Sequence, residues 1–299
     1  MEAEKLMEAL HTVEKLKRTM RHCYTSDDRK ESVAEHCWRV ALMAYWMEDE
    51  FPEVDINKVI KMCLIHDLGE CFTGDIPCFK KTEADEETEE NLLYQWVATL
   101  PEPLNEKMRT LYQEMSELKT LEAKIYKALD NMEGALSHNE SDLKTWEPHE
   151  YELTKNYGID KSQFHPYIKH LRECIRQETV DKIHACGMKA GVSIKPNTPV
   201  SALEPVLDKT EMFLIMSVEP GFGGQAFIPE SLDKIKELRN LLNARGIQAD
   251  IEVDGGIYHS NVKEVLNAGA NVIVAGSAVF KGNVAENVKG FMEILSANE

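Results

Sequence analysis

Residues 64–77 read LIHDLGECFTGDIP, and they follow directly on an apolar stretch with the pattern of a helix. Two polar residues, His66 and Asp67, stand side by side within this apolar segment. Burying two such side chains costs several kcal/mol unless something pairs with them. Neighbours on a helix point about 100° apart, so both side chains can reach an ion that lies beside the helix. The dyad therefore predicts a metal or ion-pair centre in a helical unit.

Two more candidate ligands stand at apolar boundaries on either side of this dyad. His36 lies early in ESVAEHCWRVALMAYWM (31–47), where Ser32 and Glu35 have the spacing of a capping box that starts a helix. Asp130 closes the segment IYKALD (125–130). A single histidine is more often structural and a single aspartate more often a cap. Together, imidazoles and carboxylates suit a divalent cation such as Mn, Co, Fe, Ni or Zn.

The composition changes near residue 180 and indicates two domains of different kinds. Residues 1–180 hold four of the 16 glycines and all four tryptophans, and their apolar residues recur at helical spacing, so we expect helices throughout. Residues 183–299 alternate short apolar runs with helical stretches, which predicts four parallel βα units. The apolar runs are KAGVSI (189–194), MFLIMSV (212–218), ADIEVDGG (249–256) and NVIVAGS (271–277).

Charge and cysteine content narrow the class of function. With 52 acidic and 34 basic residues, the net charge of −18 disfavours binding to nucleic acid or anionic membranes. We find no apolar run long enough to span a bilayer and no signal-peptide pattern. The seven cysteines include no C-x-x-C pair, so we expect reduced thiols, no structural zinc site and a cytoplasmic location.

The spaced pattern H…HD…D resembles that of the HD-domain metal-dependent phosphohydrolases. RHCYTSDDRKESVAEH (21–36), LIHDLGECFTGDIP (64–77) and KALDNME (127–133) look like the 5′-deoxynucleotidase-type branch of that family, over roughly residues 5–180. The resemblance implies an all-α HD-domain bundle over residues 1–180. It also implies a metal site whose ligands are His36, His66, Asp67 and Asp130.

Further roles follow from the same resemblance. Glu70 matches a carboxylate that positions or deprotonates the attacking water, and Asp75 matches a second catalytic carboxylate near the leaving oxygen. Arg21 matches an arginine that binds the substrate phosphate, with Arg18 as the alternative. This set suits the hydrolysis of a phosphomonoester, because a divalent ion lowers the pKa of a bound water and arginine pairs with phosphate in a bidentate way.

The C-terminal part resembles ribulose-phosphate 3-epimerase. HACGMKAGVSIKPNTPV (184–200), LIMSVEPGFGGQAFIP (214–229), IEVDGGI (251–257) and VIVAGSAVF (272–280) are similar to strands five to eight of its (β/α)8 TIM barrel. The resemblance covers about residues 183–297 and implies an α/β half barrel. Asp254 matches a metal ligand that also serves as one of two acid/base groups. The phosphate-binding loops are matched by Gly255, Gly256, Gly276 and Ser277.

Because the first four units of that barrel are absent, we expect no epimerase activity from a single chain. Epimerisation needs a base on one face of the carbon and an acid on the other, and Asp254 supplies only one of them. Open strand edges predict self-association through the half barrel or the HD domain, or pairing with another half barrel.

The leading hypothesis is a metal-dependent hydrolase of nucleoside 5′-monophosphates, in particular deoxynucleotides. It would bind a small phosphorylated substrate, with neither nucleic acid nor a membrane as partner. One alternative is an epimerase completed by a partner half barrel, which interconverts D-ribulose 5-phosphate and D-xylulose 5-phosphate. Another is a non-catalytic sensor of nucleotides or phosphosugars.

Overall fold

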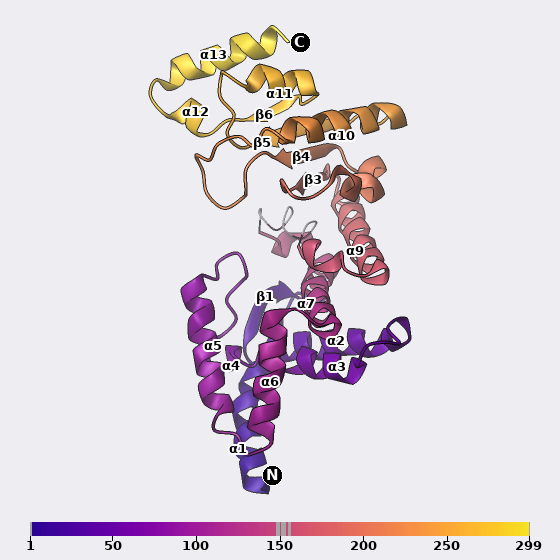
Figure 1. Ribbon diagram of the computed structural model, residues 1–299, viewed down its shortest axis with the longest axis vertical. Coiled ribbons are helices and arrows are strands. Elements are labelled where there is room, and N and C mark those ends of the chain that lie inside the picture. Colours follow the sequence, from indigo (N-terminus) through magenta and orange to yellow (C-terminus); the bar gives the residue numbers. More distant parts are fainter. Residues whose placement is uncertain (1, 148–149, 151–153, 155–156, 299) are drawn as a thin grey trace. The chain divides into compact units, whose positions relative to one another are not determined.

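The computed structural model, which describes residues 2–147, 150, 154 and 157–298, changes from helices to alternating strands and helices along the chain (Figure 1). It divides after Ile175 into two units, each with its own apolar core. The boundary falls inside helix α9, Pro166–Ala185. This order of an α-helical part and a C-terminal α/β part confirms the predicted fold class.

The first unit consists mainly of helices. Its α-helices are α1 (Ala3–Val13), α2 (Val33–Trp46), α3 (Ile56–Ile65), α4 (Glu70–Thr73), α5 (Glu83–Val97), α6 (Leu104–Glu117), α7 (Leu121–Glu140) and the start of α9. Short 3₁₀ helices connect them: η1 (Glu14–Lys17), η2 (Glu48–Glu50), η3 (Leu143–Thr145) and η4 (Asp160–Ser162).

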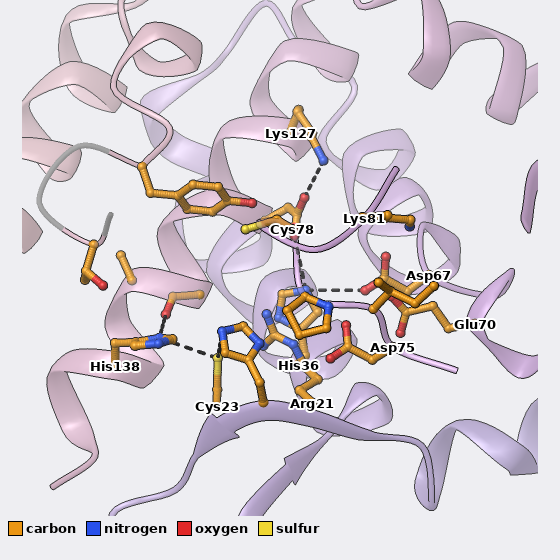
Figure 2. A pocket seen from close by; sticks show the side chains of 18 of the residues that line it. Arg21, Cys23, His36, Asp67, Glu70, Asp75, Cys78, Lys81, Lys127 and His138 are labelled. Atoms are coloured by element: carbon orange, nitrogen blue, oxygen red, sulfur yellow. Dashed lines mark hydrogen bonds and ion pairs between the residues drawn. The ribbon is translucent and has the colours of Figure 1, made fainter. Parts of the chain in front are cut away.

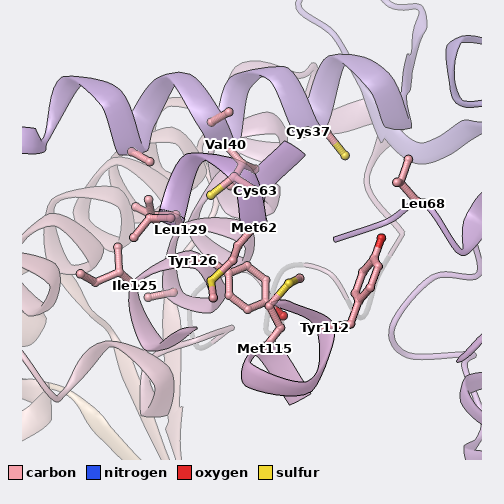
Figure 3. Close-up of a cluster of buried hydrophobic side chains, with 14 of the residues drawn as sticks. Cys37, Val40, Met62, Cys63, Leu68, Tyr112, Met115, Ile125, Tyr126 and Leu129 are labelled. Atoms are coloured by element: carbon pink, nitrogen blue, oxygen red, sulfur yellow. The ribbon is translucent and has the colours of Figure 1, made fainter. Parts of the chain in front are cut away.

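The core of this unit lies where α2, α3, α6 and α7 meet (Figure 3). Val40 of α2, Met62 of α3 and Leu129 of α7 are completely buried there. The predicted capping box starts α2, because Ser32 Oγ accepts a hydrogen bond from the Glu35 backbone N–H while the Glu35 carboxylate accepts one from the Ser32 N–H. This cap contributes about 1 kcal/mol and sets the register of the helix that carries His36.

The expectation of helix throughout residues 1–180 is wrong at one place. Strands β1 (Met20–Tyr24) and β2 (Lys30–Ser32) form an antiparallel hairpin, in which Met20 pairs with Ser32. The polar turn between them reverses the chain, and its Asp28 adopts the left-handed conformation that aspartate tolerates better than most residues. The hairpin matters for the site because β1 carries Arg21.

The second unit is built on a four-stranded parallel sheet with the order β3-β4-β5-β6. Its strands are β3 (Gly191–Ile194), β4 (Met212–Met216), β5 (Asp250–Asp254) and β6 (Val272–Val274). Its helices are the end of α9, the 3₁₀ helix η5 (Val200–Lys209), α10 (Ser231–Arg245), α11 (Val262–Ala268), α12 (Ser277–Phe280) and α13 (Val284–Ser296). The four βα units are present as predicted, with a 3₁₀ helix in the first connection.

The two faces of this sheet differ in burial. On one face, Phe213, Ile215, Ile251 and Val253 are fully buried in the core of the unit. The alternate residues, such as Leu214 of β4 and Val272 and Val274 of β6, are only half buried. Parallel sheets are normally covered on both faces, so this half-exposed face and the outer strands β3 and β6 resemble the inside and the open edges of half a barrel. No described helix of the chain is long and apolar enough to cross a membrane.

We expect Gly256→Ala to destabilise the second unit much more than Gly246→Ala. Both glycines have positive φ, +64° and +67°, which alone costs about 1 kcal/mol for alanine. A Cβ at Gly246 would meet nothing within 4 Å, whereas one at Gly256 would lie 2.3 Å from the Phe227 backbone nitrogen, and we expect about 3 kcal/mol or more. Thermal unfolding followed by far-ultraviolet circular dichroism measures both. Equal melting temperatures for the two variants would contradict the packing argument.

Candidate metal centre and its pocket

Four side chains from three helical segments converge in the first unit. His36 comes from α2, His66 and Asp67 directly follow α3, and Asp130 comes from α7. The Nε2 atom of His36 lies 3.2 Å from His66 Nε2, 3.2 Å from Asp130 Oδ1 and 3.6 Å from Asp67 Oδ2. The Nε2 atom of His66 lies 3.1 Å from Asp67 Oδ2 and 3.5 Å from Asp130 Oδ1. The structure thus brings the four predicted ligands together.

The hydrogen bonds of the two imidazoles decide which nitrogens face the centre. His66 Nδ1 lies 2.8 Å from the Cys63 carbonyl oxygen, to which only a protonated Nδ1 can donate. His36 Nδ1 contacts the carboxylate of Glu133 in the same way. The protons on Nδ1 leave both Nε2 lone pairs directed at each other and at two carboxylates. Such an arrangement is repulsive unless positive charge lies between the four groups.

A divalent cation fits this geometry. Ligands about 2.1 Å from one ion are about 3.0 Å apart in an octahedral site and about 3.4 Å apart in a tetrahedral site. Five of the six separations between the four ligand atoms run from 3.1 to 3.6 Å. Two imidazole nitrogens and carboxylate oxygens also suit the borderline metals Mn, Fe, Co, Ni and Zn.

The charges of the cluster also attract protons. Burial opposes protonation of His66, but the Asp67 carboxylate outweighs it and raises the pKa of His66 well above its usual value. Burial likewise opposes ionisation of Asp67, and His66 lowers the pKa of Asp67 to about 2. Protons and a metal ion therefore compete for the same sites, and metal binding would release protons.

A cavity of about 300 Å³ opens beside this cluster (Figure 2). Its walls include the predicted catalytic carboxylates Glu70 and Asp75. Burial first, then the charges of Asp67 and Asp75, raises the pKa of Glu70 to about 10, and no described residue hydrogen-bonds its Oε2 atom. Burial also raises the pKa of Asp75. Both carboxyl groups thus hold a proton more readily than ordinary acids do.

Arg21 reaches the same pocket from β1, whereas the alternative Arg18 does not line it. Its Nη1 atom donates to Glu31, at 2.7 Å, and to Glu133, at 3.0 Å. Among the described residues, all the hydrogen bonds of this guanidinium run through Nη1. Arg18 is exposed and pairs with Glu14 at 3.5 Å. Arg21 is therefore the arginine placed to meet an anion beside the cluster.

Two residues that contact the cluster, Glu133 and Lys127, were not among the site residues predicted from the sequence. Glu133 is completely buried and contacts both His36 and Arg21, so it orients a ligand and a pocket cation together. Lys127 Nζ lies 2.8 Å from Asp130 Oδ2 and lines the pocket. Both stand three residues from Asp130, one before and one after it, on the same face of α7. This spacing from Asp130 is the signal by which both residues could have been found in the sequence.

The predicted site residues of the second unit also lie together. One hollow is lined by Asp254, Gly255, Gly256, Gly276 and Ser277. Burial raises the pKa of Asp254. Gly255 and Gly256 both have positive φ and follow the C-terminal end of β5, so their backbone leaves the sheet in a turn that glycine adopts most easily.

Comparisons with known proteins match the two parts of the chain to two different families. Residues 13–172 match the model of the HD domain family, and residues 161–280 match that of the ribulose-phosphate 3 epimerase family. A solved structure described as a predicted metal-dependent phosphohydrolase, from Magnetospirillum magnetotacticum MS-1, is 27% identical with a TM-score of 0.53. It covers 62% of this chain and 94% of that one.

The relatives of the C-terminal part are epimerases. The chloroplastic ribulose-5-phosphate-3-epimerase of Arabidopsis thaliana is 51% identical over 38% of this chain and 40% of that protein. The ribulose-phosphate 3-epimerase of Synechocystis sp. is 47% identical over 48% of this chain and 63% of that protein. The chain thus spans about half the length of the curated relatives that it matches.

We expect Glu133→Gln to weaken metal binding by about 10- to 100-fold, because the carboxylate that orients His36 is replaced by a neutral amide. Glu140→Gln on the same helix is the matched control, since Glu140 is exposed and pairs only with Arg39 among the described residues. Titration of the metal-free protein with Mn²⁺ by isothermal calorimetry measures both affinities. Equal Mn²⁺ affinities of the two variants would show that Glu133 does not support metal binding.

Proposed function

Because this chain belongs to the HD domain family, whose model covers residues 13–172, we propose that its first unit is a metal-dependent phosphomonoester hydrolase. The observation that carries the proposal is the convergence of two imidazoles and two carboxylates beside a pocket that also contains an arginine. The solved phosphohydrolase that resembles this unit supports the same reaction class.

His36, His66, Asp67 and Asp130 would hold the ion. A divalent cation in such a site lowers the pKa of a bound water and offsets the charge of phosphoryl oxygens. We propose that this ion is Mn, Co, Fe, Ni or Zn.

The basic residues of the pocket would bind the phosphate. The net charge of −18 repels anions over the protein as a whole, so an anionic substrate needs cations gathered locally. Arg21, Lys81 and Lys127 supply them in the pocket wall. Arg21 is already held by Glu31 and Glu133, so little side-chain entropy is lost when it pairs with a phosphate.

Glu70 and Asp75 would move the protons. Glu70 presents a carboxyl oxygen that no described residue hydrogen-bonds, and a cation nearby would lower its raised pKa, which frees it to accept a proton from the attacking water. Asp75, whose pKa burial raises, is suited to keep a proton and donate it to the departing oxygen.

The substrate class we propose is nucleoside 5′-monophosphates, with a preference for deoxynucleotides. Its basis is the sequence resemblance of residues 21–36, 64–77 and 127–133 to the 5′-deoxynucleotidase-type branch. Tyr157, Ile76 and Pro77 line the pocket and offer apolar surface to a nucleoside. A sensor that binds nucleotides without turnover is the alternative for the same pocket.

We expect Asp67→Ala to lower phosphate release from dAMP at least 100-fold, because it removes a metal ligand that is also a pocket residue. The assay uses the full chain loaded with Mn²⁺ or Co²⁺ and a panel of nucleoside monophosphates. Asp49→Ala, which changes an exposed acid of η2, is the control and keeps wild-type turnover. Unchanged turnover in Asp67→Ala would overturn the hydrolase proposal. Tight dAMP binding without product in wild-type protein would favour the sensor.

For the second unit we propose pairing of two half barrels through their open edges. A closed barrel of this type needs eight strands, and the unit supplies four, with β3 and β6 outermost. A second copy would supply the other four. Asp254 and the glycine loops of the hollow would then bind a phosphate, while a single chain lacks the opposing acid/base group. An epimerase completed by a partner half barrel is the alternative.

We expect the full chain to dimerise and Val272→Lys to weaken the dimer at least tenfold, because a lysine on an edge strand opposes further pairing. Within its own sheet the lysine would neighbour Glu252, so the unit itself tolerates it. Val284→Lys, which places a lysine on the exposed surface of α13, is the control. Sedimentation velocity measures the association. A wild-type chain that sediments as a monomer would contradict the proposed pairing of half barrels. Conversion of D-ribulose 5-phosphate by the dimer would favour the epimerase.

A cytoplasmic location is also proposed. All seven cysteines are free thiols in the structure, which suits a reducing compartment.

A further inference from the structure

A second cluster of titratable side chains lines the same pocket and shares no residue with the four proposed ligands. Cys23 and His22 come from β1, His138 comes from α7, and Glu150 lies against both imidazoles. Figure 2 shows the thiol of Cys23 linked to the imidazole of His138 at one end of the pocket. Nothing in the proposed hydrolysis uses these side chains.

The cluster has the order of a nucleophile, a base and a group that orients the base. Cys23 Sγ lies 3.5 Å from His138 Nδ1, and His138 Nε2 lies 3.0 Å from Glu150 Oε1. The other oxygen of Glu150 accepts a hydrogen bond of 2.6 Å from the Glu147 backbone N–H, which fixes the carboxylate. A cysteine activated by a histidine that a carboxylate holds in place is the usual arrangement of a reactive thiol.

The same contacts argue against a second metal ion in this cluster. His138 Nδ1 also lies 3.0 Å from the Gly134 carbonyl oxygen, so both ring nitrogens face hydrogen-bond acceptors. A ring that donates from both nitrogens is an imidazolium and has no lone pair left for a metal. An imidazolium between a carboxylate and a sulfur stabilises the sulfur as a thiolate.

The electrostatics agree with this geometry. Burial opposes ionisation of Cys23, but Arg21 and the two imidazoles outweigh it and lower the pKa of the thiol to about 6. Burial also opposes protonation of His138, and its contacts with Cys23 and Glu150 raise the pKa of the imidazole to about 10. At neutral pH the pair is therefore a thiolate and an imidazolium.

The remaining cysteines lack this environment. Cys37, Cys63 and Cys71 are buried, as Cys23 is, but they do not line the pocket, and burial raises the pKa of each thiol. Cys78 lines the same pocket as Cys23, but burial raises its pKa as well. Cys78 is thus a matched control for position in the pocket.

We propose that Cys23 is a peroxide-reactive thiolate whose oxidation reversibly closes the phosphohydrolase pocket. The sulfur attacks one oxygen of hydrogen peroxide, the O–O bond breaks, and the departing hydroxide takes a proton from His138, which gives a sulfenic acid and water. The sulfur is oxidised by two electrons and the peroxide is reduced. An added dithiol restores the thiol, releasing water and leaving the dithiol as its disulfide.

The consequence for the pocket follows from β1. Arg21 and Cys23 are two residues apart on this strand, and both side chains line the pocket. Oxidation adds an oxygen atom to the wall of the pocket that Arg21 also lines, and this atom takes space that a phosphate would need. This second half of the inference rests on the proposed hydrolase function, whereas the reactivity of the thiol does not.

The experiment treats the full chain, loaded with Mn²⁺ to avoid reaction of peroxide with iron, with hydrogen peroxide in two portions, of which only the first contains dimedone. In the first portion, peptide mass spectrometry measures the rate of adduct formation at each cysteine. In the second portion, phosphate release from dAMP is followed before peroxide, after it and after dithiothreitol. Wild type, Cys23→Ser and Cys78→Ser are compared, each against its own untreated sample.

We expect the adduct at Cys23 to form about tenfold faster than at the exposed Cys186, because Arg21 and His138 favour the thiolate at Cys23. Activity should fall at least tenfold and return with dithiothreitol in wild type and Cys78→Ser, and fall less than twofold in Cys23→Ser. Slower labelling of Cys23 than of Cys186, or equal loss of activity in Cys23→Ser, overturns the proposal.

The adduct rates are measured in wild-type protein, so they decide the reactivity of the thiol even if Cys23→Ser does not fold. If untreated wild type releases no phosphate, the hydrolase proposal fails, and fast labelling of Cys23 still supports the reactive thiolate.

Discussion

The proposed metal centre of the first unit depends on the Nε2 atoms of two imidazoles, which face two carboxylates at separations of 3.1 to 3.6 Å. His36 and His66 each use Nδ1 to bind a partner behind them, Glu133 and the Cys63 carbonyl, and so present Nε2 to the centre. Three helical segments must be held in register for this to occur. The buried contacts of Val40, Met62 and Leu129 between α2, α3 and α7 supply that register. The packing of the core is therefore also what sets the spacing of the cluster.

The four side chains that converge here could be picked out in the sequence because their signals are local. An adjacent His66 and Asp67 within an apolar segment, and a capping box just before His36, can be recognised without knowing the fold. Lys127 and Glu133 could be recognised only by their spacing of three residues from Asp130 on one helix. The pair of Cys23 and His138 could not be recognised, since its role depends on which strand and helix meet in space. The hairpin that brings Cys23 to α7 was missed because its strands are short and lack a clear alternation of apolar residues.

The second unit was predictable for a different reason. Each of its strands is a short, β-branched run followed by a helical stretch, so the alternation predicts parallel βα units, and the structure arranges them in the order β3-β4-β5-β6. The pattern cannot predict whether the sheet closes into a barrel. Val272 and Leu214 are half buried in one chain, and whether they are covered depends on strands that this chain does not contain. Shared sequence with epimerases over about half their length does not supply those strands.

The two units therefore differ in a way that bears on function. In the first, every group that the proposed chemistry needs comes from one body: the four ligands, Arg21, and two carboxyls with raised pKa values. In the second, Asp254 and the glycine loops sit on an incomplete sheet. The protein repels anions overall, and Arg21, Lys81 and Lys127 line the pocket of the first unit beside its carboxylates. Arg21 is held at Nη1 by two buried carboxylates, so the phosphate that we propose there would pair with the rest of a guanidinium whose position is already fixed.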